Sequence, residues 1–505
     1  MPRPARYAAF CLLAPLALSF TAPIPARAQE AQDMPAAPAP APREFVSRHE
    51  GVFGGRKIAY TATAGDTIVK LENGKMARIF AFSYVQNDRK DPNRPVTFVF
   101  NGGPGTASVW LHMGAFGPRR VKLPDDNASA GLPPYTLENN ADSLLDVTDL
   151  VFIDPVGAGY SRAIPPTDDG KFYNLIDDAD SFTQFVQNWR IRNGRQNSPL
   201  YILGESYGSV RAGVMVRNLR RGVAKIVPNG VILLGQDMDT TITQQTPGND
   251  MPFVLYLPTY AVTAWYHNKV PRNGRTLEQV YAEAREFAYK DLQSALFLGS
   301  ALPASERTRI AARMAEMTGL PQALIERENL RVGTAVFLRE LLRDEGRILI
   351  RSDTRFTTPA TEVYHDKEAI TDVPGLVEAF QSAGAAYYRQ ELGVTLPDLF
   401  DLDGPETWDY SLPDGINVQQ TYHDVTPYVA AAMRDNPGMR LFFGSGEYDL
   451  MAAPLSVERN YTHGGIPLDR VTAKTYPAGH MIFISKSSLG KLSKDVRDFI
   501  VAGMR

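Results

Sequence analysis

Short apolar runs alternate with helical patterns over two parts of this chain, and this alternation limits the possible folds more than any other feature. Residues 175–189 place Leu175, Ala179, Phe182, Val186 and Trp189 on one stripe of a helix. Buried strands that alternate with such helices imply a mostly parallel sheet with helices on both faces. The chain is therefore predicted to be an α/β protein. The predicted strands are residues 96–100, 150–153, 200–203, 231–234, 441–443 and 471–476, and a final helix covers residues 489–499.

Residues 46–84, which precede this alternation, contain short alternating segments separated by turn-forming pairs. The pairs are Gly54-Gly55, Gly65-Asp66 and Asn73-Gly74. A tight hairpin turn needs positive φ at both central positions, which an Asn-Gly pair provides well. We therefore expect hairpins at all three pairs.

The alternation is interrupted from about residue 236 to residue 433. This part has helical stretches at 276–296 and 305–317, and its aromatic residues include Tyr256, Tyr260, Trp265 and Tyr266. An insertion of this length after a sheet strand most often forms a cap over the functional face. We predict an α/β core made of residues 44–235 and 434–505, with a largely helical cap at 236–433 whose own core contains the aromatic residues.

The first 28 residues have the pattern of an export signal. Arg3 and Arg6 precede an apolar run at residues 8–20, and Ala26-Arg27-Ala28 has the small residues of a signal-peptidase site. The run is too short to span a bilayer, which takes about 20 apolar residues. We predict a signal peptide at residues 1–28 and an exported protein, periplasmic or secreted. Residues 29–43 are rich in Pro and Ala, which predicts a semi-rigid spacer.

The composition excludes several classes of protein. With 505 residues, 44% of them apolar, the chain is too apolar to be disordered. The net charge is −3 and no basic block is present, so no nucleic-acid partner is expected. No later stretch is apolar enough to anchor the mature chain in a membrane. The only cysteine, Cys11, lies in the predicted signal, which leaves the mature chain without a disulfide or a cysteine metal ligand.

The sequence Gly-Glu-Ser-Tyr-Gly occupies residues 204–208, directly after the predicted strand at 200–203. An apolar stripe at residues 212–219 predicts a helix after it. Gly-x-Ser-x-Gly between a strand and a helix is the nucleophile elbow of the α/β-hydrolase fold, a turn that is too sharp for larger neighbours. We therefore predict an α/β-hydrolase with Ser206 as its nucleophile. An ordinary glycine-rich turn is the alternative.

A serine hydroxyl needs a base, and in this fold a carboxylate and then a histidine follow the serine along the chain. Of the seven histidines, His463 and His480 lie beyond residue 441. His480 follows a predicted strand in a Gly-His loop that leads to the final helix, whereas Thr-His-Gly-Gly around His463 predicts a surface loop. We predict that His480 is the base.

Two carboxylates follow the predicted strand at 441–443. Gly446 and Asp449, followed by Pro454, have the spacing of the acid loop in many α/β-hydrolases. We predict that Asp449 orients His480, with Glu447 on the same loop as the fallback. A solvated carboxylate in a turn is the alternative for either residue.

Asn-Gly-Gly-Pro-Gly at residues 101–105 follows the predicted strand at 96–100. A glycine-rich loop at this point would let a substrate approach backbone N–H groups closely, as an oxyanion hole requires. The loop contains neither Gly-Lys-Ser/Thr nor Gly-x-Gly-x-x-Gly, so a phosphate site is not expected.

Four motifs in the same order resemble those of the serine carboxypeptidases. They are Asn-Gly-Gly-Pro-Gly with a later Gly-Pro at residues 100–118, Val-Phe-Ile-Asp-Pro-Val-Gly-Ala-Gly-Tyr-Ser at 151–161, Gly-Glu-Ser-Tyr-Gly at 204–208 and Gly-His-Met at 479–481. The resemblance extends over about residues 96–484. It implies an α/β-hydrolase sheet with an inserted helical cap, release of C-terminal residues from peptide substrates, and no metal or organic cofactor.

The resemblance also implies roles for single residues. The family's catalytic triad corresponds to Ser206, Asp449 and His480. Its oxyanion hole corresponds to the N–H groups of Gly103 and Tyr207. The positions that hold the terminal carboxylate of the substrate correspond to Asn101, Gly102 and Glu205.

The sequence departs from the family pattern in three places. Thr106 stands where the family usually has a disulfide cysteine, and Ile482-Phe483 replaces the usual Val-Pro after the histidine. Ala115 stands where many members carry a second glutamate, paired with the one at Glu205. The last change concerns the terminal-carboxylate site and leaves the triad untouched.

Three functions are compatible with these residues. The leading hypothesis is a periplasmic serine carboxypeptidase that trims peptides. The same fold and triad can serve an esterase or an acyltransferase, because a fold does not fix its substrate. A catalytically silent binding protein is the third, and the presence of Ser206, Asp449 and His480 argues against it.

Overall fold

The computed structural model of the protein describes residues 41–504 except 88–90, 92, 125–128, 362–372, 403, 405–406 and 412–421. The predicted signal peptide and residues 29–40 of the predicted spacer lie outside the described residues. Ala41–Arg505 forms one compact unit. Within the described residues, no helix combines the length and apolar content needed to cross a membrane. Nor do these residues contain a group of three or more His, Cys, Asp or Glu side chains that could hold a metal ion.

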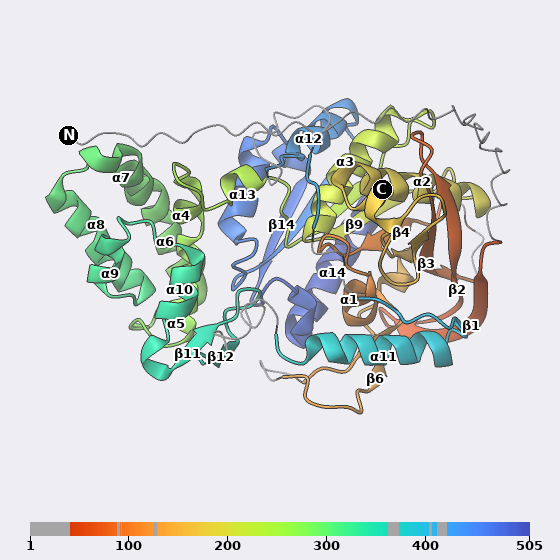
Figure 1. The fold of residues 1–505 in the computed structure, drawn as a ribbon, viewed down its shortest axis with the longest axis horizontal. Helices are drawn as coiled ribbons and strands as arrows, with labels where there is room; N and C mark the ends of the chain where they lie inside the picture. The colour runs from red at the N-terminus through yellow and green to blue at the C-terminus, as the bar shows by residue number, and fades with distance from the viewer. Residues whose placement is uncertain are drawn as a thin grey trace, which may run out of the picture. The chain divides into compact units, whose positions relative to one another are not determined.

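A mixed sheet forms the centre of this unit (Figure 1). Its strands lie in the order β1 (Glu44–Phe53), β2 (Arg56–Lys70), β3 (Met76–Gln86), β7 (Asp149–Ile153), β4 (Val96–Phe100), β9 (Leu200–Glu205), β10 (Gly230–Leu234), β13 (Arg440–Gly446), β14 (Val471–Tyr476), with the short β8 (Arg162–Ala163) paired to β3. From β7 to β14 all neighbours are parallel, whereas β1, β2, β3 and β7 pair antiparallel. The sheet confirms the predicted α/β class, and the serine turn follows a central parallel strand, as in the α/β-hydrolase fold.

The burial of the strands explains their sequences. β4, β7, β9 and β10 are buried along their whole length. A parallel strand that is covered on both faces reads as a continuous apolar run, which is the pattern seen in the sequence. β1, at the edge of the sheet, alternates exposed and half-buried residues instead. All six strands predicted from apolar runs lie inside observed strands.

Two of the three predicted hairpins are present, and the prediction for Gly65-Asp66 was wrong. Gly54-Gly55 joins β1 to β2, and the loop with Asn73-Gly74 joins β2 to β3. Gly65 and Asp66 lie inside β2 and continue its pairing. A Cβ on Gly65 would lie 2.7 Å from the carbonyl oxygen of Arg43. Glycine is needed here because the chain that enters β1 passes close to the backbone, not because the strand turns.

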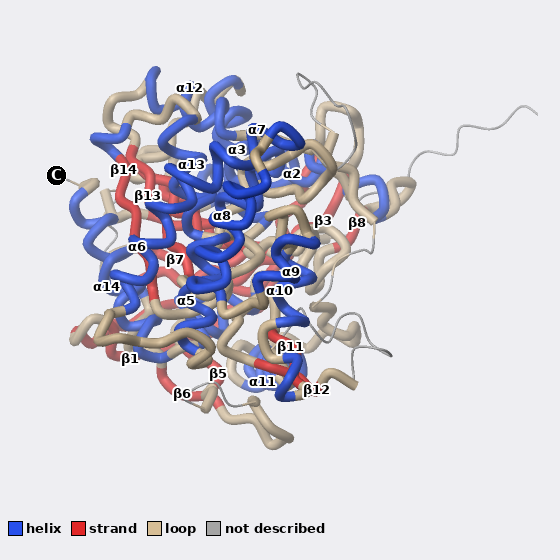
Figure 2. The backbone as a smooth tube through the Cα atoms, turned by 90° about the vertical axis from the view of Figure 1, so that its left-hand side faces the viewer, coloured by secondary structure: helices blue, strands red, loops and turns tan. Residues whose placement is uncertain are grey.

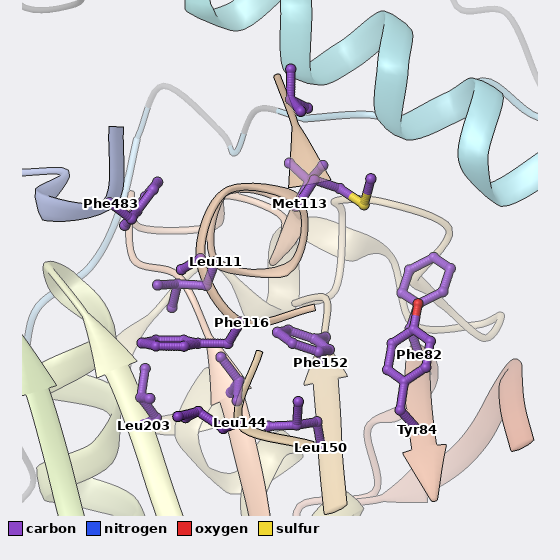
Figure 3. Close-up of a cluster of buried hydrophobic side chains, with 14 of the residues drawn as sticks. Phe82, Tyr84, Leu111, Met113, Phe116, Leu144, Leu150, Phe152, Leu203 and Phe483 are labelled. Atoms are coloured by element: carbon purple, nitrogen blue, oxygen red, sulfur yellow. The ribbon is translucent and has the colours of Figure 1, made fainter. Parts of the chain in front are cut away.

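Helices cover both faces of the sheet. Neighbouring residues of a strand point to opposite sides, so a strand that is apolar throughout must be covered on both faces. One face carries α2 (Leu175–Arg192), α3 (Tyr207–Arg221), α12 (Thr426–Asp435) and α13 (Pro454–His463). The other carries α1 (Val109–Leu111), a π-helical turn at His112–Phe116, α11 (Leu376–Gln390) and α14 (Lys486–Ala502). Figure 3 shows part of this second core, in which Leu111 and Phe116 lie near Phe152 of β7 and Leu203 of β9.

The chain between β10 and β13 forms a helical region with its own apolar core. It contains α4 (Met251–Leu255), α5 (Leu257–Tyr266), α6 (Leu277–Phe287), α7 (Gln293–Leu298), α8 (Ala304–Thr318), α9 (Gln322–Arg327), α10 (Thr334–Glu340) and a small sheet of β11 (Arg347–Leu349) and β12 (Thr357–Pro359). Figure 2 shows α5, α8 and α10 in front of the strands. Tyr256 and Tyr260 are buried in this core, and Trp265 and Tyr266 pack against it.

The inserted chain also contacts the sheet region directly. Its last two helices, α11 and α12, pack in the two cores of the sheet. Tyr448 and Leu450, from the loop after β13, are buried in the core of the helical region. Tyr256 donates a hydrogen bond through its hydroxyl to the carbonyl oxygen of Met451 at 3.3 Å. The insertion is therefore in contact with the loop that carries Asp449.

Candidate active site

Ser206 stands at the junction of β9 and α3. Its φ of 57° and ψ of −129° are rare for a residue other than glycine, so the surrounding structure must hold this conformation. Its N–H donates to the carbonyl oxygen of Leu234 in β10 at 2.9 Å. A Cβ on Gly204 would lie 2.3 Å from the carbonyl oxygen of Gly208. Glycine is required at position 204 because the strand and the helix approach each other so closely at this turn.

Asp449 and His480 come from the loops after β13 and β14 and contact each other. Asp449 Oδ2 lies 2.7 Å from His480 Nδ1. The other carboxylate oxygen, Oδ1, accepts hydrogen bonds from the N–H groups of Met451 at 2.7 Å and Ala452 at 2.9 Å. Asp449 is fully buried, so these donors compensate for the loss of water around its charge. A carboxylate only accepts, so His480 carries a proton on Nδ1.

The opposite nitrogen of His480 has no hydrogen-bond partner among the described residues. His480 Nε2 is buried and makes no hydrogen bond within the part of the chain that the structure describes. It lies 3.7 Å from Oε1 of Glu205, the residue before Ser206. Gly235 leaves room for the ring, since a Cβ there would lie 2.9 Å from its Cε1 and Nδ1 atoms. In its neutral form, an imidazole that is anchored at Nδ1 and has no hydrogen bond at Nε2 can take a proton from a hydroxyl.

Burial and charge act in opposite directions on the protonation of this site. Burial lowers the pKa of His480, but the carboxylates of Asp449, Glu205 and Asp237 raise it, to about 9. Burial raises the pKa of Glu205, and the charge of His480 opposes that shift. Burial likewise raises the pKa of Asp237 to about 7, opposed by His480 and Arg351. The charges of these carboxylates therefore favour the imidazolium form of His480, whose Nε2 must lose its proton before it can act as a base.

The alternative acid and the alternative histidine lie elsewhere. Glu447 lines a cavity of about 400 Å³ together with Glu278, Pro477 and other residues. Burial, with the charge of Glu278, raises the pKa of Glu447 to about 7. His463 is the last residue of α13 and is exposed. Of the two acid candidates, Asp449 is the one that hydrogen-bonds His480.

The loop at residues 101–105 packs directly on the serine turn. A Cβ on Gly102 would lie 2.5 Å from Tyr207 N and 2.9 Å from Ser206 Cβ. Gly103 is exposed and has a φ of +102°. Tyr207 is the first residue of α3, and the first N–H groups of a helix have no partner within it. Such N–H groups favour negative charge, so this edge of the site suits an anion.

A buried ion pair joins that loop to α3. The Arg211 guanidinium has no exposed surface and binds both oxygens of Asp178 in α2, at 2.7 and 3.2 Å. Arg211 Nη1 also donates to the carbonyl oxygen of Asn101 at 2.7 Å. The hydroxyl of Tyr207 donates to Asp178 Oδ2 at 3.2 Å and accepts from Trp408 Nε1 at 3.2 Å. One network of hydrogen bonds therefore holds both the loop and the start of the helix.

Sequence reasoning missed Arg211 and Asp178, although a signal was present. Asp178 falls on the apolar stripe of α2, between Leu175 and Phe182. Arg211 lies four residues before Met215, which belongs to the apolar stripe of α3. A charged residue on a stripe that faces the core is almost always paired. Two such residues on neighbouring helices predict a buried ion pair.

Asn101 and Glu205 are joined inside the site. Asn101 Nδ2 donates to Glu205 Oε2 at 3.0 Å, and Asn101 Oδ1 accepts from the N–H of Leu111 at 3.0 Å. Both side chains are buried. A backbone hydrogen bond from Gly102 also opposes the raised pKa of Glu205. The structure thus brings Asn101, Gly102 and Glu205 together beside His480.

The three departures from the family pattern lie around this site. Thr106 donates its N–H to the carbonyl oxygen of Gly102 at 3.1 Å. Phe483 is buried against Gly114, where a Cβ would lie 2.8 Å from its ring. Ala115 is fully buried in the apolar core. Position 115 therefore adds no carboxyl group to the one at Glu205.

Comparison with known proteins identifies one family over part of the chain. Residues 69–228 match the serine carboxypeptidase family. Serine-type carboxypeptidase F of Aspergillus niger is 29% identical over 141 residues, which cover 28% of this chain and 24% of that protein. Pheromone-processing carboxypeptidase kex1 of Sclerotinia sclerotiorum is 29% identical over 185 residues, which cover 35% of this chain and 26% of that protein. The chain spans about a quarter of the length of these curated relatives.

Among solved structures, the chain is similar to a prohormone-processing carboxypeptidase of Saccharomyces cerevisiae, with a TM-score of 0.49 and 16% identity over 87% of this chain and 91% of that one. The family match at 69–228 includes the loop at 101–105 and the turn at 204–208 and ends before Asp449 and His480. The sequence likeness therefore covers the serine and the loop, whereas the acid and the base depend on the geometry of this structure.

Proposed function

We propose that this protein is a serine carboxypeptidase that releases C-terminal residues from peptides through an acyl-enzyme on Ser206. The observation that carries the proposal is His480, whose Nδ1 lies 2.7 Å from Asp449 and whose buried Nε2 has no hydrogen-bond partner among the described residues. This arrangement leaves one nitrogen ready to take the proton of Ser206 Oγ. The family match over residues 69–228 supports the same function.

The reaction follows from the chemistry of these three residues. Ser206 Oγ attacks the carbonyl carbon of the last peptide bond while its proton passes to His480 Nε2, and Asp449 stabilises the imidazolium that forms. His480 then gives the proton to the leaving amine, and the C–N bond breaks. The acyl group remains on Ser206 until a water, deprotonated by His480, hydrolyses the ester. The products are a shortened peptide and a free amino acid.

Backbone amides would stabilise the oxyanion of the tetrahedral intermediate. In this proposal the donors are the N–H groups of Gly103 and Tyr207. The close packing of Gly102 on Tyr207 N supports this, because it places the loop beside the first residue of α3. Fixed donors at the site of developing charge are commonly a large contribution to catalysis.

A terminal carboxylate would bind at Asn101, Gly102 and Glu205. Burial raises the pKa of Glu205, which favours the protonated acid. A protonated carboxyl and an amide N–H can both donate to a carboxylate. Ala115 supplies no second carboxyl, so Glu205 would act there without a paired glutamate.

We also propose that residues 1–28 direct export and that the mature protein is periplasmic or secreted. The charge, the apolar run and the Ala-Arg-Ala sequence of this segment support the proposal.

The activity can be tested with a mixed peptide library and mass spectrometry of the products. We expect peptides shortened one residue at a time from the C-terminus, and no products with Ser206→Ala. Internal cuts, or hydrolysis of esters alone, would contradict an exopeptidase and favour an esterase or acyltransferase that uses the same residues. Failure of a fluorophosphonate to label Ser206 would favour a silent binding protein.

A further inference from the structure

A short segment of the inserted region, Arg351–Arg355, lies against the loop that carries His480. It connects β11 to β12. The N–H of His480 donates to the carbonyl oxygen of Ser352 at 2.6 Å. The N–H of the preceding residue, Gly479, donates to Asp353 Oδ2 at 3.0 Å. Two successive amides of the histidine loop are therefore bound by this one segment.

The contact between the two segments leaves no free space. A Cβ on Gly479 would lie 2.3 Å from Asp353 Cβ and 2.4 Å from the carbonyl oxygen of Ser352. Any side chain at position 479 would push the segments apart. Glycine before the histidine is thus required by the approach of Asp353.

The charge of Asp353 is buried and compensated. Its side chain is almost fully buried, and Arg355 binds both carboxylate oxygens, with Nε at 2.9 Å from Oδ1. Arg355 Nη1 also donates to the carbonyl oxygen of Pro477 at 2.8 Å. The Asp353–Arg355 ion pair therefore binds the His480 loop on both sides of Ala478, at the N–H of Gly479 and at the carbonyl oxygen of Pro477.

The same segment also binds the loop that carries Asp449. The N–H of Thr354 donates to the carbonyl oxygen of Tyr448 at 3.1 Å, and the N–H of Leu450 donates to the carbonyl oxygen of Arg351 at 3.2 Å. Tyr448 and Leu450 are the two neighbours of Asp449. One segment of the insertion is thus hydrogen-bonded to both loops whose side chains meet at the Asp449–His480 contact.

We propose that Asp353, together with Arg355, is a positioning residue that holds the His480 loop so that the imidazole keeps its contact with Asp449 and presents Nε2 to Ser206. The inference depends on the proposed function, because it assigns Asp353 to the catalytic geometry of that site. Among the described residues, the Asp353 side chain makes no hydrogen bond or ion pair with His480, and it acts through the backbone of Gly479. The inserted region would then help to hold His480 in place.

The test compares three variants with the wild-type protein. Asp353→Ala removes the acceptor for Gly479 N–H, and we expect kcat to fall about 10- to 100-fold with KM changed by less than about 2-fold, because a small displacement of a catalytic group costs this much. The rate of fluorophosphonate labelling at Ser206 should fall in parallel. Asp353→Asn keeps an acceptor oxygen for Gly479 N–H and should restore most of kcat.

The third variant separates positioning from folding. Asp353→Ala combined with Arg355→Met removes the ion pair without leaving a buried charge, so it should recover thermal stability. If Asp353 positions the loop, kcat should stay low although stability returns. If kcat returns with stability, the inference is overturned.

A matched control removes an ion pair of the same region away from the site. Arg331 binds both oxygens of Asp250 at 2.7 and 3.0 Å, and Asp250→Ala should leave the labelling rate unchanged. Equal rates for Asp353→Ala and Asp250→Ala would overturn the positioning role. Absence of labelling and peptidase activity in the wild-type protein would instead overturn the proposed function, so the two failures are distinguishable.

Discussion

Arg211 Nη1 donates a hydrogen bond to the carbonyl oxygen of Asn101 at 2.7 Å, deep in the core and away from solvent. The same guanidinium holds Asp178, which in turn accepts a hydrogen bond from the hydroxyl of Tyr207. Asn101 is the first residue of the loop that contains Gly103, and Tyr207 follows Ser206. This one cation therefore links, directly or through Asp178, the two segments whose amides we propose as the oxyanion hole.

Replacement of Arg211 by Lys should lower activity more than it lowers substrate binding. A lysine keeps the charge but cannot bind Asp178 and Asn101 together with the same fork of donors. We expect kcat to fall by up to about 100-fold with a small change in KM. Steady-state kinetics with a peptide substrate measure both. Arg331→Lys, which weakens the pair with Asp250, is the control for loss of an ion pair, and equal effects on kcat would argue against a role at the oxyanion hole.

Loss of the serine or the histidine should nearly abolish catalysis. Ser206→Ala or His480→Ala should reduce kcat about 10⁴-fold or more, because the members of a triad act as a unit. Asp449→Asn should also reduce kcat by orders of magnitude, since an amide at this position would favour the wrong tautomer of His480. A fluorophosphonate should label the wild-type protein at Ser206 alone. Wild-type activity in Asp449→Asn would refute our assignment of the acid.

Glu205→Gln should make KM for free-acid peptides nearly independent of pH. In the wild-type protein, burial raises the pKa of Glu205, so the protonated form that can donate to a carboxylate is lost as the pH rises. KM for the wild type should therefore rise with pH, whereas an amide donates without titrating. KM measured against pH with free-acid and C-terminally amidated versions of one peptide checks this. If KM depends on pH in the same way for both proteins and both peptides, Glu205 does not bind the terminal carboxylate and only supports the serine turn.

Glu447→Gln should change stability with pH and leave kcat near the wild-type value. Burial and the charge of Glu278 raise the pKa of Glu447 to about 7, from 4.5. A carboxyl whose pKa is raised on folding stabilises the protein at low pH, and that stabilisation is lost as the pH rises through about 7. The free energy of unfolding of the variant minus that of the wild type should therefore increase by on the order of 1–3 kcal/mol from pH 5 to pH 8. Denaturant unfolding at the two pH values measures this gain. If the variant and the wild type have the same free energy of unfolding at each pH, ionisation of Glu447 does not destabilise the folded protein.

The exported protein should begin at or near Gln29. Cleavage after Ala28 follows from the small residues at positions 26 and 28. N-terminal sequencing of protein recovered from outside the cytoplasm tests the position. Because the remaining chain would contain no cysteine, its melting temperature should not change with dithiothreitol. Retention of Met1 in that material would rule out the signal peptide.

The amino-acid sequence by itself determined the features that depend on neighbours along the chain. The turn at 204–208 was predictable because a strand pattern, two glycines and a helix pattern lie within twenty residues, and the sharp turn tolerates little else. The buried strands were predictable because parallel strands covered on both faces must be apolar throughout. The prediction for Gly65 was wrong for the complementary reason. Glycine is needed there because the backbone of Arg43, 22 positions away in the chain, lies close to it, and not because of its neighbours along the chain.

The tertiary structure decided which of two candidate carboxylates contacts His480. Glu447 and Asp449 lie on one loop, two residues apart, and the spacing of Gly446, Asp449 and Pro454 favoured Asp449 without excluding Glu447. Asp449 meets His480 because the N–H groups of Met451 and Ala452 hold its other oxygen, whereas Glu447 lines a separate cavity. The contact of Asp353 with the His480 loop was likewise not predictable from the sequence, because Asp353 binds the N–H of Gly479, 126 residues further along the chain. Such contacts join segments that only the folded chain brings together, and their energies depend on burial and direction, which a linear pattern does not encode.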